Sequence, residues 1–307
     1  MLMRPQRREF IQGLAAGAAS LLAALPGAAR ASTAFGRDPR GRAIVSVNLN
    51  GRGPFRLVLD TGANRTVLTP RVLHVLGLSA DAGRQAVLGA GGRAPGHIVG
   101  LDHLQTGAFE RRDVSAVVMS GEMVGAYDGL LGMDALAGSR LAIDFEQGVF
   151  EVGPGGGEAP PGFDPVPGRL RYGQLLETQI EIRDVAASAL IDSGSQGTIA
   201  NAALLARLPE APRSGRFVVV GVREGQATAA RVFSDVKVGP LRIKELLVYP
   251  GEIAPYRDEA GREQPGLLLG IDALSAARAV AIDFARAELQ IAIGEQNLVW
   301  ARGPEPA

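Results

Sequence analysis

The spacing of apolar residues predicts short β-strands over most of the chain. Residues 42–50 alternate apolar and polar side chains, and the turn residues Gly51–Pro54 separate them from a more apolar run at 55–59. Alternation with a period of two, bounded by glycine and proline, is typical of strands joined by tight turns. The second run stops at Asp60, within the stretch Leu57–Asn64, so we expect a strand to deliver this aspartate to a turn.

Few and short helices are expected among these strands. Thr69 and Pro70 suit the N-cap and first position of a short helix that ends at Gly77. Residues 86–99 have the pattern of a β-hairpin with a glycine-rich tip, and residues 114–119 that of another buried strand. The pattern therefore indicates an all-β protein with few short helices.

The same order of elements recurs in the second half of the chain. Asp192 follows an apolar run in the stretch Ala189–Gln196, 132 residues after Asp60. The sequence Leu-Leu-Gly-X-Asp-Ala-Leu occurs at 130–136 and again at 268–274, and we expect its aspartates to brace local structure. A repeat of about 130 residues is too long for a solenoid unit. We therefore predict two similar β lobes related by an approximate two-fold axis.

A stretch rich in glycine and proline divides the two halves. Residues 153–169 favour neither a helix nor a central strand, so we interpret them as part of a linker. The predicted order is an N-terminal lobe at 32–152, a linker at 153–171 and a C-terminal lobe at 172–307.

Residues 1–31 are predicted to be an export signal that takes no part in the fold. Arg4, Arg7 and Arg8 form a basic head, an apolar run follows, and Ala29–Ala31 offers small residues for cleavage. The segment resembles a bacterial twin-arginine signal; a Sec signal with a chance arginine pair and an uncleaved anchor are the alternatives. The apolar run is shorter than the roughly 20 residues of a membrane-spanning helix. We expect a periplasmic or secreted protein that is not inserted in a membrane once the signal is removed.

The amino-acid composition limits which functions and cofactors are to be expected. The 307 residues carry no formal net charge, so no basic surface for nucleic acid is indicated. The three histidines are scattered and there is no cysteine, which leaves little from which to build a zinc site and excludes a thiol nucleophile or a disulfide. We expect the function to need neither a metal nor an organic cofactor.

Two motifs and the segments that follow them resemble the aspartic peptidases of the pepsin and retropepsin group. Asp60–Ala63 (DTGA) is similar to the retroviral signature, and Asp192–Ser195 (DSGS) to the form common in pepsin-like lobes. Leu130–Gly132 and Leu268–Gly270 are similar to the segment that crosses behind each catalytic loop in that family. The resemblance covers nearly all of residues 42–293 and implies a bilobal pepsin-like fold with two β-barrel-like lobes.

The resemblance implies that Asp60 and Asp192 are the catalytic residues. Two carboxylates held about 3 Å apart cannot both ionise cheaply, so the pair shares one proton over an acidic pH range. The charged member would take a proton from a bound water, while the protonated member donates to the developing oxyanion. Gly62 and Gly194 are expected to let the chain turn sharply, so that backbone N–H groups can point at the carboxylates.

The neighbours of the two aspartates are expected to support the loops, but unequally. By resemblance, the hydroxyls of Thr61 and Ser193 brace the loops against each other across the axis. Ser195 has a hydroxyl that can donate to the outer oxygen of Asp192, whereas Ala63 at the matching place has none. A donor favours the charged form of a carboxyl, so we hypothesise a bias of ionisation towards Asp192.

Two glycine-containing hairpins are candidates for flaps that close over a bound peptide. The first comprises Gly89, Ala90, Gly91 and Gly92, and the second comprises Gly221 and Val222. An extended peptide can pair with such a hairpin as an added strand. Residues 85–100 contain no tyrosine, which pepsin-like enzymes usually carry on the first flap, so the design looks closer to the retroviral type.

The leading hypothesis is an exported aspartic endopeptidase that acts on peptides or proteins and is monomeric, because both acids lie in one chain. The alternative is a catalytically weak or inactive bilobal protein that binds peptides or regulates. A third option is a zymogen-like enzyme in which residues 32–41 or the linker block the cleft. Wide separation of the two carboxylates would favour binding over hydrolysis.

Overall fold

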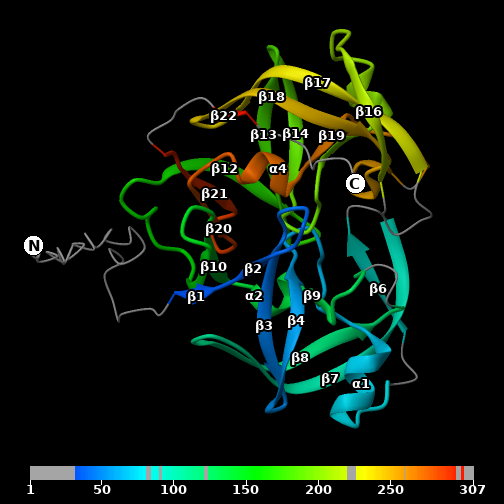
Figure 1. The fold of residues 1–307 in the computed structure, drawn as a ribbon, viewed down its shortest axis with the longest axis vertical. Helices are drawn as coiled ribbons and strands as arrows, with labels where there is room; N and C mark the ends of the chain where they lie inside the picture. The colour runs from blue at the N-terminus through cyan, green and yellow to red at the C-terminus, as the bar shows by residue number, and fades with distance from the viewer. Residues whose placement is uncertain are drawn as a thin grey trace, which may run out of the picture.

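Two β-barrel-like lobes make up the described part of the chain (Figure 1). The structure is a computed structural model, and it describes residues 32–80, 84–89, 92–120, 124–219, 226–258, 260–294 and 299–300. In Figure 1 the N-terminal strands, coloured blue to teal, occupy the lower half of the view, and the C-terminal strands lie above them. Strands dominate and helices are few and short, so the predicted all-β, bilobal class is confirmed.

The N-terminal lobe is built on one eight-stranded sheet. Its strands are β2 (Gly36–Arg37), β3 (Ala43–Leu49), β4 (Arg52–Leu59), β5 (Val67–Leu68), β6 (Arg84–Gly89), β7 (Gly92–Thr106), β8 (Phe109–Val118) and β9 (Gly129–Leu131). They follow the order β2-β3-β4-β9-β5-β8-β7-β6, in which β6 and β7 form the expected hairpin. Apolar side chains of β3 and β4, such as Val45 and Leu57, are fully buried in the core.

The C-terminal lobe repeats this arrangement. Its strands are β13 (Leu175–Ile182), β14 (Val185–Ile191), β15 (Thr198–Ala200), β16 (Arg213–Val219), β17 (Gln226–Val238), β18 (Leu241–Pro250), β19 (Gly266–Leu269) and β22 (Val299–Trp300). The order β13-β14-β19-β15-β18-β17-β16 matches the order β3-β4-β9-β5-β8-β7-β6 strand for strand. The internal repeat seen in the sequence is therefore a repeat of topology.

A third group of strands joins the two lobes. It contains β1 (Thr33–Ala34), β10 (Ser139–Asp144), β11 (Val149–Pro154), β12 (Asp164–Arg171), β20 (Ala279–Asp283) and β21 (Glu288–Ala292). Their order, β1-β11-β10-β20-β21-β12, continues into β13, and Figure 1 shows them at the left, between the lobes. Strand β10 pairs with its own repeat equivalent β20, with Ala142 opposite Ala281. Equivalent residues face each other there, so the pseudo-two-fold axis passes between them.

The helices are short and sit beside the sheets. They are α1 (Pro70–Leu76), α2 (Met133–Leu136), α3 (Ala202–Leu205), α4 (Ile271–Leu274) and the 3₁₀ helix η3 (Ala254–Tyr256). Helix α1 follows Thr69 and is capped by Gly77 in a left-handed conformation (φ 71°), where the sequence indicated. None of the helices in the described residues is both long and apolar enough to cross a membrane.

The predicted linker contains a strand that we did not expect. Residues 164–171 form β12, which pairs with β21 along its first half and with β13 along its second half. The expectation that this stretch would not form a central strand is therefore wrong. The carbonyl of Pro167 accepts from the Thr178 hydroxyl (2.7 Å), one residue before the first backbone pair of β12 with β13, Gly168 with Thr178.

The segment after the predicted signal is part of the body of the protein. Strand β1 pairs with β11, and β2 pairs with β3. Between them and the core, the Arg37 guanidinium donates to the Phe145 carbonyl and lies over the Phe145 ring. Integration of residues 32–41 into both sheets argues against the zymogen-like option in which this segment is a separate blocking element.

Close packing at Gly129 provides a test of the fold. A Cβ atom on Gly129 in β9 would lie less than 3.0 Å from the Val67 carbonyl oxygen, whereas one on Gly100 in β7 would meet nothing within 4 Å. We expect Gly129→Ala to lower the free energy of unfolding by about 2–3 kcal/mol, because backbone must move. Gly100→Ala is the matched control and should change it by no more than about 0.5 kcal/mol. Urea denaturation followed by circular dichroism measures both, and equal effects would contradict this packing.

Candidate active site

The two predicted catalytic aspartates meet where the lobes meet. Strands β4 and β14 each end one residue before an aspartate, Asp60 or Asp192. The N–H of Asp60 donates to the Leu131 carbonyl (3.1 Å), and that of Asp192 to the Leu269 carbonyl (3.0 Å). Each aspartate is thus tied to the strand that crosses behind its loop, β9 or β19. The two carboxyl groups lie close enough for each to shift the pKa of the other.

Gly62 and Gly194 are needed for a reason that the sequence did not reveal. Their N–H groups donate to Asp60 Oδ1 (2.9 Å) and Asp192 Oδ1 (2.8 Å), as expected, but neither glycine has a positive φ. A Cβ atom on Gly62 would lie less than 3.0 Å from the Asp192 carboxyl carbon, and one on Gly194 equally close to that of Asp60. Each loop therefore lacks a side chain where the carboxyl group of the other lobe must fit.

Hydroxyl groups of Thr61 and Ser193 hold the two loops together. Thr61 Oγ1 donates to the Ile191 carbonyl (2.9 Å) and accepts from the Ser193 N–H (2.9 Å). In the reverse direction, Ser193 Oγ donates to the Leu59 carbonyl (2.7 Å) and accepts from the Thr61 N–H (3.2 Å). Both side chains are buried, so water does not compete for these bonds. The structure places these residues as braces across the axis.

Ser195 contacts Asp192 through its backbone and not through its hydroxyl. Its N–H donates to Asp192 Oδ1 (2.9 Å), whereas its Oγ donates to the Gly197 carbonyl (2.8 Å). A hydroxyl has one proton to donate. The expectation that this hydroxyl holds the outer oxygen of Asp192 is therefore wrong, and the argument for ionisation at Asp192 loses its basis.

A second pair of carboxyls supports the loops from behind. The N–H and hydroxyl of Thr66 both donate to Asp134 (2.8 Å each), and those of Thr198 donate to Asp272 (3.0 and 2.9 Å). Burial raises the pKa of Asp134, and it raises that of Asp272 to about 6 against the opposing threonine hydrogen bonds. Both aspartates brace local structure, which is the role that we expected.

The surroundings raise the pKa of both candidate catalytic carboxyls. Burial is the largest cause for each of them. At Asp60 the Gly62 N–H, the contact with Asp192 and the charge of Arg42 oppose the rise in pKa. At Asp192 the neighbouring charge of Asp60 adds to burial, so that its pKa lies well above the usual range. The pair therefore keeps a proton at a pH where a solvated aspartate has lost it.

The structure describes the stems of both candidate flaps but not their tips. Gly89 and Gly92 form the last pair of the β6–β7 hairpin. Four flap candidates lie outside the described residues, namely Ala90, Gly91, Gly221 and Val222. Strand β7 also contacts η3, so the first hairpin reaches the C-terminal lobe.

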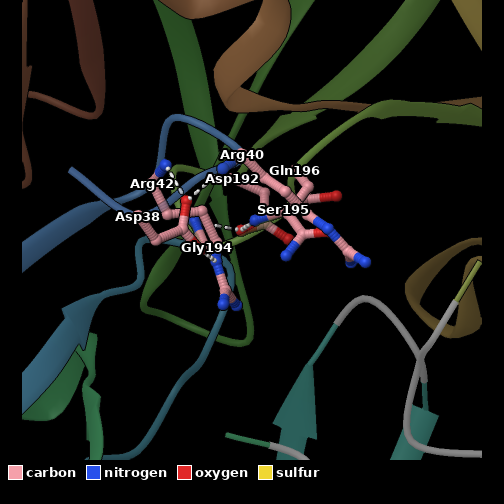
Figure 2. A network of polar contacts seen from close by, with 7 residues as sticks. All are labelled: Asp38, Arg40, Arg42, Asp192, Gly194, Ser195 and Gln196. Atoms are coloured by element: carbon pink, nitrogen blue, oxygen red, sulfur yellow. Dashed lines mark hydrogen bonds and ion pairs between the residues drawn. The ribbon is translucent and has the colours of Figure 1, made fainter. Parts of the chain in front are cut away.

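The arm before β3 brings charged residues to the site that our sequence reasoning missed. The Asp38 carboxylate accepts from the N–H groups of Arg40 and Arg42 (2.9 Å each) and from Arg42 Nε (2.8 Å). Arg40 donates to the Gln196 side chain, just after the second candidate catalytic loop (Figure 2). Hairpin spacing from the sequence would set Arg42 against Leu59, and a one-residue register shift between Leu49 and Val47, which only the structure shows, moves it to Asp60.

Fold and site together define a class of protein. Two lobes of one topology each contribute an aspartate, a hydroxyl residue and a glycine to a shared centre, which is the architecture of a bilobal aspartic protease. The family model for aspartyl proteases matches residues 45–135 and 178–273, more than half of the chain. The chain therefore belongs to the aspartyl protease family. A comparison with curated proteins found no match.

Removing the Thr61 hydroxyl tests the brace between the loops. Thr61→Val keeps the shape but leaves the Ile191 carbonyl and the Ser193 N–H without this partner in a buried site. We expect the free energy of unfolding to fall by about 1–3 kcal/mol. Thr61→Ser retains the hydroxyl and should recover most of the loss. Thermal and urea denaturation measure both variants, and a Val variant as stable as the wild type would disprove the brace.

Proposed function

We propose that the protein is an exported aspartic endopeptidase that hydrolyses peptide bonds with a water molecule activated between Asp60 and Asp192. The observation that carries the proposal is that the carboxyl group of each lobe reaches the glycine of the opposite loop, where a Cβ atom would collide with it, and that burial raises the pKa of both carboxyls. Wide separation of the carboxyls would have favoured the alternative, a protein that binds peptides without cleaving them. Their close approach favours hydrolysis.

The proposed reaction uses the one proton that the pair shares. The charged carboxylate takes a proton from the water, whose oxygen forms a bond to the peptide carbonyl carbon. The protonated carboxyl donates to the carbonyl oxygen, giving a neutral tetrahedral intermediate. The C–N bond then breaks as the amine nitrogen receives a proton and the new hydroxyl loses one, which restores the starting pair. The cycle consumes one water and calls for no metal or organic cofactor.

An extended peptide is the substrate class that we propose. Among the described strands, β6 and β16 end their respective sheets, so each flap stem has an edge that faces no further described strand. A peptide in extended form can pair with the backbone of such an edge irrespective of its sequence. Both carboxyls come from one chain, so we propose that the monomer is the active form.

Replacing either aspartate tests the proposed mechanism. Asp60→Asn and Asp192→Asn keep the size of the side chain but remove the shared proton, so each should lower kcat for peptide cleavage by about a thousandfold or more. Asp235→Asn is the matched control, because Asp235 is exposed and its left-handed backbone (φ 56°) suits asparagine equally well. It should retain full activity. Peptide-library cleavage read by mass spectrometry measures all three, and full activity in either catalytic variant would refute the shared-water mechanism.

We also propose that residues 1–31 direct export by the twin-arginine route to the periplasm or outside the cell. Arg7 and Arg8 are the residues on which this depends. Replacing both by lysine keeps the basic head but removes the arginine pair, so the precursor should accumulate inside the cell. Cell fractionation and immunoblotting measure this. Unchanged export of the double variant would support the Sec alternative instead.

A further inference from the structure

The two halves of the candidate site differ in the residue that lies across the hairpin from each aspartate. In the N-terminal lobe Ile44 and Val58 form the last pair of the hairpin, and extending this register by two residues sets Arg42 against Asp60. In the C-terminal lobe Glu177 pairs with Leu190, and the same two steps place Leu175 opposite Asp192. Leu175 is buried, with 1% of its surface exposed. A cation therefore stands at one aspartate and an aliphatic side chain at the other.

Arg42 is held in place by contacts on two sides. Its Nε donates to Asp38 Oδ2 at 2.8 Å, and the Asp38 side chain is only 3% exposed. Its guanidinium also lies over the Tyr127 ring, 5.7 Å from the centroid. Asp38 is in turn fixed by the backbone N–H groups of Arg40 and Arg42. Because the guanidinium is already ordered, its interaction with a neighbouring charge costs no further side-chain entropy.

Resting on the proposed function, we propose that Arg42, oriented by Asp38, is a positioning residue that makes Asp60 the charged member of the pair and leaves the shared proton on Asp192. The charged groups that shift the pKa of Asp60 are Asp192 from the opposite loop and Arg42 from the arm. Arg42 is itself paired with Asp38. The charge of Arg42 does oppose the rise in the pKa of Asp60.

This assignment gives each carboxyl one role in the first chemical step. Asp60 takes the proton from the attacking water, and Asp192 donates its proton to the carbonyl oxygen of the substrate. It is the opposite of the bias that the Ser195 hydroxyl suggested. The arm at residues 32–42 thereby contributes to the chemistry although it lies before the first motif.

Replacing Arg42 by leucine, the residue at the matching place in the other lobe, tests the assignment. Without the positive charge, ionisation of Asp60 becomes harder, so the acidic limb of the kcat/KM profile should move to higher pH, by about 0.5–1 unit. Arg42→Lys keeps the charge and should retain most of the wild-type profile. Arg56→Leu is the control, because Arg56 also lies over Tyr127 (5.1 Å) but stands four residues from Asp60; its acidic limb should not move.

A double variant guards against misfolding. Arg42→Leu leaves Asp38 buried without its guanidinium partner, and Asp38→Asn combined with Arg42→Leu removes that unpaired charge. The double variant should also shift the acidic limb to higher pH, by less than the single variant because the negative charge of Asp38 is gone as well. An acidic limb that stays in place in the folded leucine variant, or moves equally far in Arg42→Lys, would overturn the assignment.

Direct titration separates this inference from the proposed function. In the full-length protein labelled with ¹³C at the aspartate carboxyls, resonances are assigned with Asp60→Asn and Asp192→Asn. The first ionisation of the wild-type pair should appear mainly at Asp60, and it should shift to higher pH in Arg42→Leu. First ionisation at Asp192 would overturn the assignment. A protein that cleaves no peptide but titrates as expected would instead refute the endopeptidase proposal alone.

Discussion

The contact between the two candidate catalytic loops is the interaction on which the rest of the structure depends. Each carboxyl occupies the space that a side chain on the opposite glycine would take, and Thr61 and Ser193 exchange four hydrogen bonds across the same axis. A shift of one lobe against the other would strain these bonds on both sides. The close approach of two carboxyls, which is electrostatically unfavourable, is thus enforced by buried backbone and hydroxyl contacts.

The rest of the fold transmits that constraint outwards. Parallel pairs β4–β9 and β14–β19 anchor the two loops from behind, and the Thr66–Asp134 and Thr198–Asp272 bonds tie each loop to the turn beyond. Pairing of β10 with β20 then joins the lobes a second time, again between repeat equivalents. Two separate isologous contacts on one axis define the relative orientation of the lobes, which a single contact would leave free to rotate.

Much of the fold and of the candidate site could be predicted from the sequence, because the patterns that indicate them are local or occur twice. Alternating patterns, the cap at Gly77 and the order of motifs depend on neighbouring residues, and the duplication doubled the evidence for each. Contacts between the halves were predictable only where the family resemblance supplied them, as for Thr61 and Ser193. A glycine is required at position 62 only because the Asp192 carboxyl of the other lobe lies against it. The Ser195 hydroxyl has a competing acceptor, the Gly197 carbonyl, which the sequence did not indicate. The prolines similarly suggested a linker at 153–171. Strand β12 forms there because its first half pairs only with β21 and its second half only with β13.

Duplication supplies a symmetric frame, but the proposed chemistry needs two unlike groups. If both loops were identical, the shared proton would rest equally on either carboxyl, and half of the molecules would hold the water beside the wrong acid for any one substrate orientation. A peptide has a direction, so a site that binds it in one orientation gains from a proton placed beforehand. Divergence at a position opposite each aspartate, outside both motifs, can bias the proton while leaving the glycines, the hydroxyl brace and the crossing strands unchanged. Arg42 and Leu175 are the residues at that position by register, and both lie on the strand or arm opposite the loop and not in the loop itself.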